Sequence, residues 1–312
     1  MKVDSTPLSS TRSPPAIPAH PVVRVVHPSG HLVGHEDALE SGIHMLEGAG
    51  CKVRFDPQRS SESWRGYLAG PDERRLSEFN SALSESGVDL VWCARGGSGL
   101  NRIADQIIAR ACGLAPRCIV GYSDITAILT PLAQRASWTT FHGPVITSLT
   151  RAEPITSVID CLSVMRGDLT SIAFEPQKGN GHHHGRLLGG NLTVLASMLG
   201  TSTTPLLEPR AVWLLEDVGE TMYRLDRSFT QLVKSGLFDT SNCIWLGDLG
   251  LESSVKHAQM VEQIRKDAPC TVMWGAPAGH RGHLATLPIG RQVSIDFGAG
   301  RLSAMRNRVG HA

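Results

Sequence analysis

The sequence has no long hydrophobic run, no excess of charge of either sign and no closely paired cysteines. No stretch approaches the length of about 18 consecutive apolar residues that a membrane-spanning helix needs, which excludes such a helix. The 30 basic and 29 acidic residues leave a formal net charge of +1. We therefore expect no binding to nucleic acid and no attraction to an anionic membrane surface.

The seven cysteines are odd in number, scattered along the chain and never arranged as Cys-x-x-Cys. Most of them lie within apolar runs, which is typical of buried free thiols in a reducing compartment rather than of a disulfide framework. The first twenty residues contain four prolines but no apolar segment of the kind that forms a secretory signal. These features predict a cytoplasmic protein with a flexible tail at residues 1–20.

Signatures of metal and nucleotide sites are also missing. The 13 histidines include no His-Glu-x-x-His motif or comparable ligand spacing. The run His182, His183 and His184 could hold a metal adventitiously, but its composition is more typical of a solvated loop. The glycine-rich loop at residues 95–99 has neither the glycine spacing of a dinucleotide-binding fold nor a following Gly-Lys-Ser/Thr. We expect no cofactor and no metal, and a plain nucleotide- or phosphate-binding module is the non-enzyme alternative.

The chain is long enough for two domains, because 312 residues with 41% hydrophobic residues can supply two cores. Strand and helix signals alternate from residue 22 onward, which predicts an α/β domain with a parallel sheet covered on both faces. Strands are expected at 22–27, 51–55, 88–94 and 117–120, and helices at 35–48, 72–86, 100–112 and 125–132.

After residue 150 the rhythm of the sequence changes. We expect an N-terminal domain at 21–150, an exposed linker at 151–185 and a C-terminal mixed α+β domain at 186–312, with strands curled into a partial β-barrel. Beyond residue 150, helices are expected at 155–165, 189–199, 223–235 and 255–267, and strands at 212–216, 244–246 and within 285–305.

Ser123 is placed between a short apolar strand and a segment that can continue as a helix. This arrangement predicts a sharp strand-to-helix turn, a nucleophile elbow, at the carboxyl edge of the sheet. The start of the helix would offer free backbone N–H groups to a developing oxyanion, and Asp124 suits the positive end of the helix dipole. A plain serine N-cap without chemistry is the alternative interpretation.

Two further residues could complete a catalytic set with Ser123. Glu216 ends an apolar strand, where a carboxylate needs a cationic or N–H partner, and Arg224 or Arg227 could be that partner. His280 lies in a glycine-flanked loop, and an imidazole there can exchange protons near neutral pH, although most loop histidines only face solvent. Together they supply a nucleophile, an orienting carboxylate and a base in the chain order Ser, Glu, His.

Six motifs in this order resemble the LD-carboxypeptidase family. Residues 92–97, 121–126 and 142–144 are similar to its N-terminal domain, and residues 189–192, 215–227 and 279–290 to its C-terminal domain. The family comprises serine peptidases that remove the terminal D-alanine from murein tetrapeptides, and relatives that give immunity to microcin C-type peptide-nucleotide antibiotics.

The resemblance implies a site in the cleft between the two domains. It assigns the nucleophile to Ser123, the orienting carboxylate to Glu216 and the base to His280. It also implies an oxyanion hole formed by the backbone N–H groups of Gly97 and Asp124. Glu220 and His283 are close competitors for the carboxylate and the base.

The expected activity is hydrolysis of the amide bond between an L-configured centre and a terminal D-amino acid, D-alanine of murein tetrapeptide in peptidoglycan recycling. Arg95 is the candidate cation for the free carboxylate of this small peptide. The alternative is a microcin C-type immunity peptidase, which would need an aromatic clamp for a purine. Trp213, Trp245 and Trp274 lie in strand-like runs that favour burial, and so favour the murein substrate. We also expect a homodimer.

Overall fold

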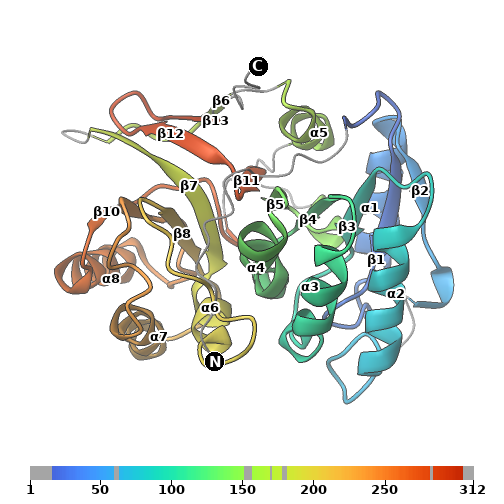
Figure 1. Cartoon of the computed structure of the whole chain (residues 1–312), viewed down its shortest axis with the longest axis horizontal. Coiled ribbons are helices and arrows are strands. Elements are labelled where there is room, and N and C mark those ends of the chain that lie inside the picture. The colour runs from blue at the N-terminus through green and yellow to red at the C-terminus, as the bar shows by residue number, and fades with distance from the viewer. Residues whose placement is uncertain are drawn as a thin grey trace.

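The computed structural model describes residues 16–59, 63–150, 157–168, 171–177, 181–281 and 284–304. In these ranges the chain forms a six-stranded sheet and a seven-stranded sheet, which lie side by side with helix α4 (Thr126–Ala136) between them (Figure 1). The predicted parallel sheet in the N-terminal half is confirmed.

The first sheet has the strand order β11-β5-β4-β3-β1-β2. Its parallel strands are β1 (Val22–Val26), β2 (Lys52–Arg54), β3 (Leu90–Cys93), β4 (Cys118–Gly121) and β5 (Thr140–His142). All residues of β3, β4 and β5 are buried, as expected for strands covered on both faces. Strand β11 (Leu287–Ile289) joins the edge antiparallel to β5, although it comes from the C-terminal part of the chain.

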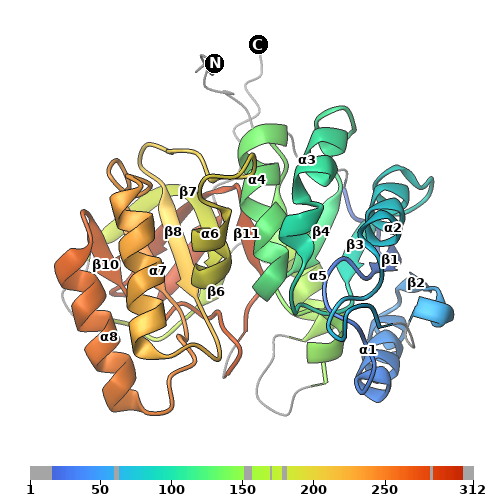
Figure 2. The ribbon, with the colours of Figure 1, turned by 90° about the horizontal axis from the view of Figure 1, so that it is seen from below.

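Helices cover this sheet on both faces. Figure 2 shows α2, α3 and α4 on one side of the strands, and α1 and α5 on the other. Their bounds are α1 (Glu36–Gly48), α2 (Asp72–Ser84), α3 (Ala104–Cys112) and α5 (Val158–Arg166). Short 3-10 helices lie at Pro57–Arg59, Leu100–Arg102, Ser123–Ile125 and Ile146–Ser148.

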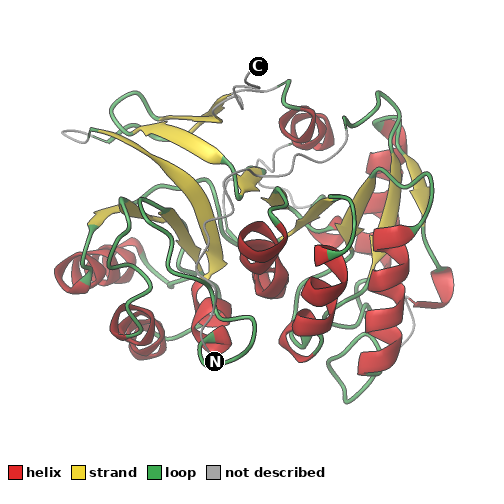
Figure 3. Cartoon of the chain, in the orientation of Figure 1, coloured by secondary structure: helices red, strands yellow, loops and turns green. Residues whose placement is uncertain are grey.

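The second sheet has the order β10-β9-β8-β7-β12-β13-β6, so its outer strands are β10 and β6. The pairs from β7 to β10 are parallel and the pairs from β7 to β6 are antiparallel. The strands are β6 (Ser171–Ala173), β7 (His182–Asn191), β8 (Val212–Glu216), β9 (Cys243–Leu246), β10 (Thr271–Met273), β12 (Gln292–Asp296) and β13 (Arg301–Ala304). Three helices lie beside its parallel strands (Figure 3): α6 (Leu192–Met198), α7 (Met222–Lys234) and α8 (Ser254–Asp267).

The segment expected as a linker contains regular structure. Residues 157–185 contribute helix α5, strand β6 and the first part of β7. The histidines at 182–184, expected in a solvated loop, pair as part of β7 with β12, and the helix expected from residue 189 begins only at Leu192. The cause is pairing with a strand more than a hundred residues later, which the local composition does not reveal. Of the predicted tail, residues 1–15 lie outside the described residues, whereas Ile17 is buried.

The two sheets are joined by close packing of α4 against β7. The Asn191 N–H donates to Thr126 Oγ1 at 2.9 Å, and a Cβ atom at Gly190 would lie 2.4 Å from the same oxygen. Glycine is therefore needed where β7 passes the start of α4. This contact fixes the end of β7 beside the helix that follows Ser123.

Two expectations from composition concern membranes and thiols. Among the helices of the described ranges, none combines the length and the apolar character that crossing a bilayer requires. All seven cysteines are free, and five of them are buried, as the scattered pattern predicts.

Candidate active site

Ser123 lies on a strained turn between β4 and the start of α4. Its φ angle is +61°, a left-handed conformation that residues other than glycine rarely adopt. The neighbouring loop leaves little room, because a Cβ atom at Gly96 would lie 3.0 Å from Ser123 Cβ and 3.2 Å from Ser123 Oγ. The backbone around both residues therefore determines where the hydroxyl group lies.

The Asp124 side chain ties the serine turn to the glycine-rich loop. Its Oδ2 accepts a hydrogen bond from the Leu100 N–H at 2.9 Å, and the residue is buried. Burial raises the pKa of this carboxyl above its ordinary value, although the hydrogen bond from Leu100 opposes the shift. The side chain thus has a structural role, and the helix start expected here is a 3-10 turn followed by α4.

The glycine-rich loop at 95–99 is held on its other side by residues 30–31. The Gly30 N–H donates to Gly96 O at 3.0 Å, and Arg95 Nη1 donates to His31 O at 2.8 Å. Partial burial lowers the pKa of the Arg95 guanidinium, which has no carboxylate partner among the described residues. Arg95 is therefore a cation that is held in place and available to an anionic ligand.

Glu216 and His280 form a buried pair on the other side of the site. Glu216 is the last residue of β8 and has no exposed surface, and its Oε2 lies 3.0 Å from Nδ1 of His280. Burial alone would raise the pKa of this carboxyl, but the side chains of His142 and His280 outweigh that effect and lower it to about 2. The contact fixes which ring nitrogen of His280 faces the carboxylate.

The structure shows the surroundings of two alternatives that the sequence left open for Glu216. Glu220 Oε2 lies 2.7 Å from Nε of Arg224 on the surface of α7, so Glu220 and not Glu216 pairs with this arginine. Arg227 is placed over the ring of Tyr223, at 5.6 Å from its centroid. Among the described residues, the alternative partners Arg224 and Arg227 form no ion pair with Glu216, which contacts two histidines instead. His283 lies outside the described residues.

Two adjoining cavities meet at Gly97 and Ser123. The first has a volume of about 360 Å³ and is lined by His35, Arg95, Gly96, Gly97, Tyr122, Ser123, Val145, Thr147 and His280. The second, of about 490 Å³, includes Tyr67, Ser98, Asn101, Arg102, Asn191, Thr193, Asp217 and Glu220 among its lining residues. Both sheets contribute to this cleft, which contains the predicted Ser123, His280, Arg95 and Gly97.

Asp217 and His142 are residues of the site region that sequence reasoning missed. Asp217 accepts hydrogen bonds from Asn191 Nδ2 at 3.2 Å and Thr193 Oγ1 at 2.7 Å, and burial raises its pKa. His142 ends β5 and lies 3.7 Å from Glu216. The signal was the position of His142 at the end of a short aromatic and β-branched segment that follows α4, since a parallel strand there ends at the same sheet edge as β4.

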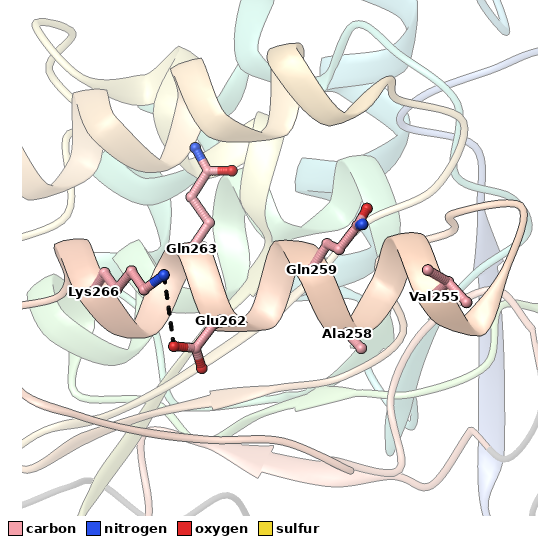
Figure 4. A pocket seen from close by; sticks show the side chains of 6 residues that line it. All are labelled: Val255, Ala258, Gln259, Glu262, Gln263 and Lys266. Atoms are coloured by element: carbon pink, nitrogen blue, oxygen red, sulfur yellow. Dashed lines mark ion pairs between the residues drawn. The ribbon is translucent and has the colours of Figure 1, made fainter.

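A further hollow lies along α8, outside the cleft. Val255, Ala258, Gln259, Glu262, Gln263 and Lys266 line it, and the side chains of Glu262 and Lys266 are 3.8 Å apart (Figure 4). It shares no residue with the two cavities at Ser123. Among the described residues, no three His, Cys, Asp or Glu side chains gather as metal ligands.

Comparison with known proteins gives consistent matches along the chain. The profile described as LD-carboxypeptidase N-terminal domain matches residues 23–143, and the profile described as LD-carboxypeptidase C-terminal domain matches residues 184–295. A putative carboxypeptidase of Synechocystis is 33% identical over 290 residues, covering 89% of this chain and 92% of the relative. The murein tetrapeptide carboxypeptidase of Pseudomonas aeruginosa is 33% identical over 275 residues, covering 83% and 89%.

Solved structures give the same fold. The microcin C7 self-immunity protein superimposes with a TM-score of 0.79 at 21% identity, covering 95% of this chain and 98% of that protein. At this identity the similarity concerns the fold alone. The two matching domain profiles and the relatives at 33% identity show that the chain belongs to the LD-carboxypeptidase family of peptidases.

Proposed function

We propose that the protein is a serine peptidase that hydrolyses the amide bond between an L-configured centre and a terminal D-amino acid. The observation that carries this proposal is the buried pair of Glu216 and His280 beside the cavity that also contains Ser123. Ser123 is the nucleophile on a nucleophile elbow, His280 the general base and Glu216 the carboxylate that orients the base.

The chemistry proceeds through an acyl-enzyme. His280 takes the hydroxyl proton of Ser123 as the oxygen attacks the carbonyl carbon of the substrate, and then gives this proton to the leaving amine. Glu216 accepts a hydrogen bond from Nδ1 of His280, which makes Nε2 the basic nitrogen of the ring. Water then attacks the ester of Ser123 by the same route, which releases the shortened peptide.

The backbone N–H groups of Gly97 and Asp124 form the proposed oxyanion hole. Gly97 has a φ angle of +119°, and Asp124 is in the first turn after the strained serine. Neither N–H group is bound to an acceptor in the part of the chain that the structure describes. Two preoriented donors beside the nucleophile would stabilise the charge that develops on the carbonyl oxygen.

Arg95 indicates which of the two cavities would bind each end of the substrate. A carboxypeptidase substrate ends in a free carboxylate, and Arg95 lines the first cavity without a carboxylate partner among the described residues. The leaving D-amino acid would therefore occupy this first cavity and its carboxylate would pair with the guanidinium. The acyl portion of the peptide would extend into the second cavity, beyond Ser123 and Gly97.

The terminal D-alanine of a murein tetrapeptide is the proposed leaving group. The name of the Pseudomonas aeruginosa relative supports this choice. Trp213 and Trp245 are fully buried, Trp274 is partly buried with Arg265 at 5.0 Å from its ring centroid, and none of the three lines either cavity, which disfavours a purine clamp. Tyr67, about half exposed and lining the second cavity, supports aminoacyl-nucleotide conjugates as a second candidate.

One experiment tests the activity and separates the two candidates. The protein is incubated with murein tetrapeptide and, separately, with an aminoacyl sulfamoyl-adenylate, and the products are identified by mass spectrometry. We expect release of D-alanine from the tetrapeptide by the wild type and no release by Ser123→Ala. Cleavage of the adenylate alone would establish the second candidate. Turnover of either substrate by Ser123→Ala at the wild-type rate would refute the serine mechanism.

The finer features of the organisation stay predictions. They are the domain limits at residues 150 and 186, the partial barrel, the homodimer, the cytoplasmic location and the role in peptidoglycan recycling. The cytoplasmic location rests on the cysteine pattern, since the seven thiols are all free. The small peptide is the proposed partner, and neither a metal nor a cofactor has a part in the proposed reaction.

A further inference from the structure

Glu216 is in contact with two histidines, and the proposed reaction uses only one of them. Its Oε2 lies 3.0 Å from Nδ1 of His280, while its Oε1 lies 3.7 Å from Nε2 of His142. His142 and Glu216 have no exposed surface. Within the described ranges, neither ring nitrogen of His142 has a hydrogen-bond partner, and neither does Oε1 of Glu216. The geometry therefore leaves this nitrogen and this oxygen to each other.

His142 belongs to the part of the first sheet that carries the nucleophile. It is the last residue of β5 and pairs in register with Gly121, the last residue of β4, two positions before Ser123. Antiparallel pairing with Leu287 of β11 holds its other side. His142 thus stands on a fixed backbone between the nucleophile strand and the C-terminal segment.

The ring of Tyr122 connects the two histidines. Its centroid lies 6.0 Å from that of His142 and 4.6 Å from that of His280, and Tyr122 is buried. The three rings and the Glu216 carboxylate form one packed group beside Ser123. A change in the orientation of Glu216 would therefore be transmitted to His280.

The electrostatics require a second partner for Glu216. A fully buried, ionised carboxylate is costly unless several polar groups compensate its charge. No lysine or arginine side chain forms an ion pair with Glu216 among the described residues, and the adjacent Asp217 adds a carboxylate rather than a cation. Nε2 of His142, at 3.7 Å, is the ring nitrogen placed to compensate Oε1. With this oxygen held, the carboxylate cannot rotate away from His280.

We propose that His142 is a positioning residue that holds Glu216 through Oε1 and so keeps Oε2 directed at Nδ1 of His280. The inference rests on the proposed function, because it concerns the same charge relay. It makes the relay a unit of four side chains, in which the first sheet supplies both Ser123 and the residue that orients Glu216. The carboxylate of the second sheet is active only when it packs against the first.

The test compares two replacements of His142 in two backgrounds. His142→Phe keeps an aromatic ring without a donor, and His142→Gln keeps an N–H donor. In the wild-type background we expect His142→Phe to lower kcat about 10- to 100-fold, with KM within about twofold, because a contact to a charged group is lost. His142→Gln should recover most of this loss. In the Glu216→Ala background, His142→Phe should cause no further loss, since it acts through Glu216.

A matched control separates positioning from stability. His27 is another buried histidine, which directly follows β1 of the first sheet, and its Nδ1 lies 3.0 Å from Oε1 of Glu78. His27→Phe should lower the thermal midpoint while leaving kcat within about threefold of the wild type. For His142→Phe, the decrease in kcat should instead be larger than the change in its thermal midpoint accounts for.

Each outcome of the test has a distinct meaning. Equal losses from His142→Phe in both backgrounds, or unchanged kcat in the wild-type background, would overturn the positioning role. If His142→Phe does not fold, His142→Met replaces it, and failure of both to fold would show that the role is structural. Wild-type activity of Glu216→Ala would instead refute the proposed triad, independently of His142.

Discussion

The two sides of the cleft hold their reactive groups by different means. On the side of the first sheet, the backbone places Ser123, through a left-handed φ angle and a glycine loop that leaves little room for a Cβ atom at Gly96. On the side of the second sheet, the contact of the buried Glu216 carboxylate with Nδ1 of His280 sets the orientation of the base. One side is determined by steric fit and the other by electrostatics.

The difference indicates how each side should respond to change. A steric arrangement is disturbed by added atoms and is insensitive to pH. A buried carboxylate held by polar partners is disturbed by the loss of its charge or of a partner, and its contribution to stability depends on pH. The following predictions test this division, from the largest expected effect to the smallest.

The electrostatic side is tested by a double-mutant cycle. His280→Ala should lower kcat on the order of 10⁴-fold or more, and Glu216→Ala by a similar or smaller factor, as for members of one catalytic unit. The double variant should be about as slow as His280→Ala alone. Steady-state kinetics on a tetrapeptide substrate measures all three, with Glu220→Ala as the matched control of small effect. Additive losses, or a larger loss at Glu220 than at Glu216, would show that Glu216 does not act through His280.

The steric side is tested by adding one methyl group. Gly96→Ala places a Cβ atom within about 3 Å of Ser123 and should lower kcat roughly 100-fold, because small displacements of a nucleophile are costly. Gly48→Ala is the control, since a Cβ atom at the end of α1 meets nothing within 4 Å. Unchanged kcat in Gly96→Ala would show that the serine turn adapts and that the steric description is wrong.

Arg95 is expected to act mainly on binding of the substrate carboxylate. Arg95→Gln should raise KM by about 10- to 100-fold, since a hydrogen bond to a charged group is lost, with a smaller effect on kcat. Arg54→Gln removes an arginine that pairs with Glu85 on the surface and should leave both constants unchanged. The same increase in KM for a substrate whose terminal carboxylate is amidated would contradict the assignment of Arg95.

Glu216 should make stability depend on pH. Its pKa is held at about 2, below its ordinary value of 4.5, so its contribution is fully present above about pH 4.5. This contribution is lost as the pH falls toward 2, and it amounts to about 3 kcal/mol. The free energy of unfolding in urea should therefore differ less between the wild type and Glu216→Gln near pH 2.5 than at pH 6. A difference that does not change with pH would mean that Glu216 is not held ionised.

The backbone side of the cleft was also the more predictable one from sequence. The strand before Ser123, the turn and the helix after it are adjacent in the chain, so local patterns predicted all three. Strand β8 was predicted with its observed bounds, which placed Glu216 at its end. Local signals suffice where the elements are consecutive and their apolar runs are clear.

The electrostatic side depends on contacts between distant parts of the chain. The sequence left Glu216 and Glu220 as competitors, because spacing alone does not show which carboxylate is buried beside His280. His142 was missed for the same reason, since its partner lies in the other sheet. The pairing of β7 with β12 and of β11 with β5 likewise joins segments about 110 and 145 residues apart, which local composition does not encode.

The most direct test of the account is the rate at which a fluorophosphonate phosphonylates the protein with loss of fluoride, measured by intact mass and peptide mapping. The account predicts one label per chain on Ser123 in the wild type and none in Ser123→Ala. It also predicts a label on Ser123 that forms far more slowly in His280→Ala, because the two sides of the cleft act as one unit. Labelling of a different residue, or a rate on Ser123 that does not depend on His280, would contradict it.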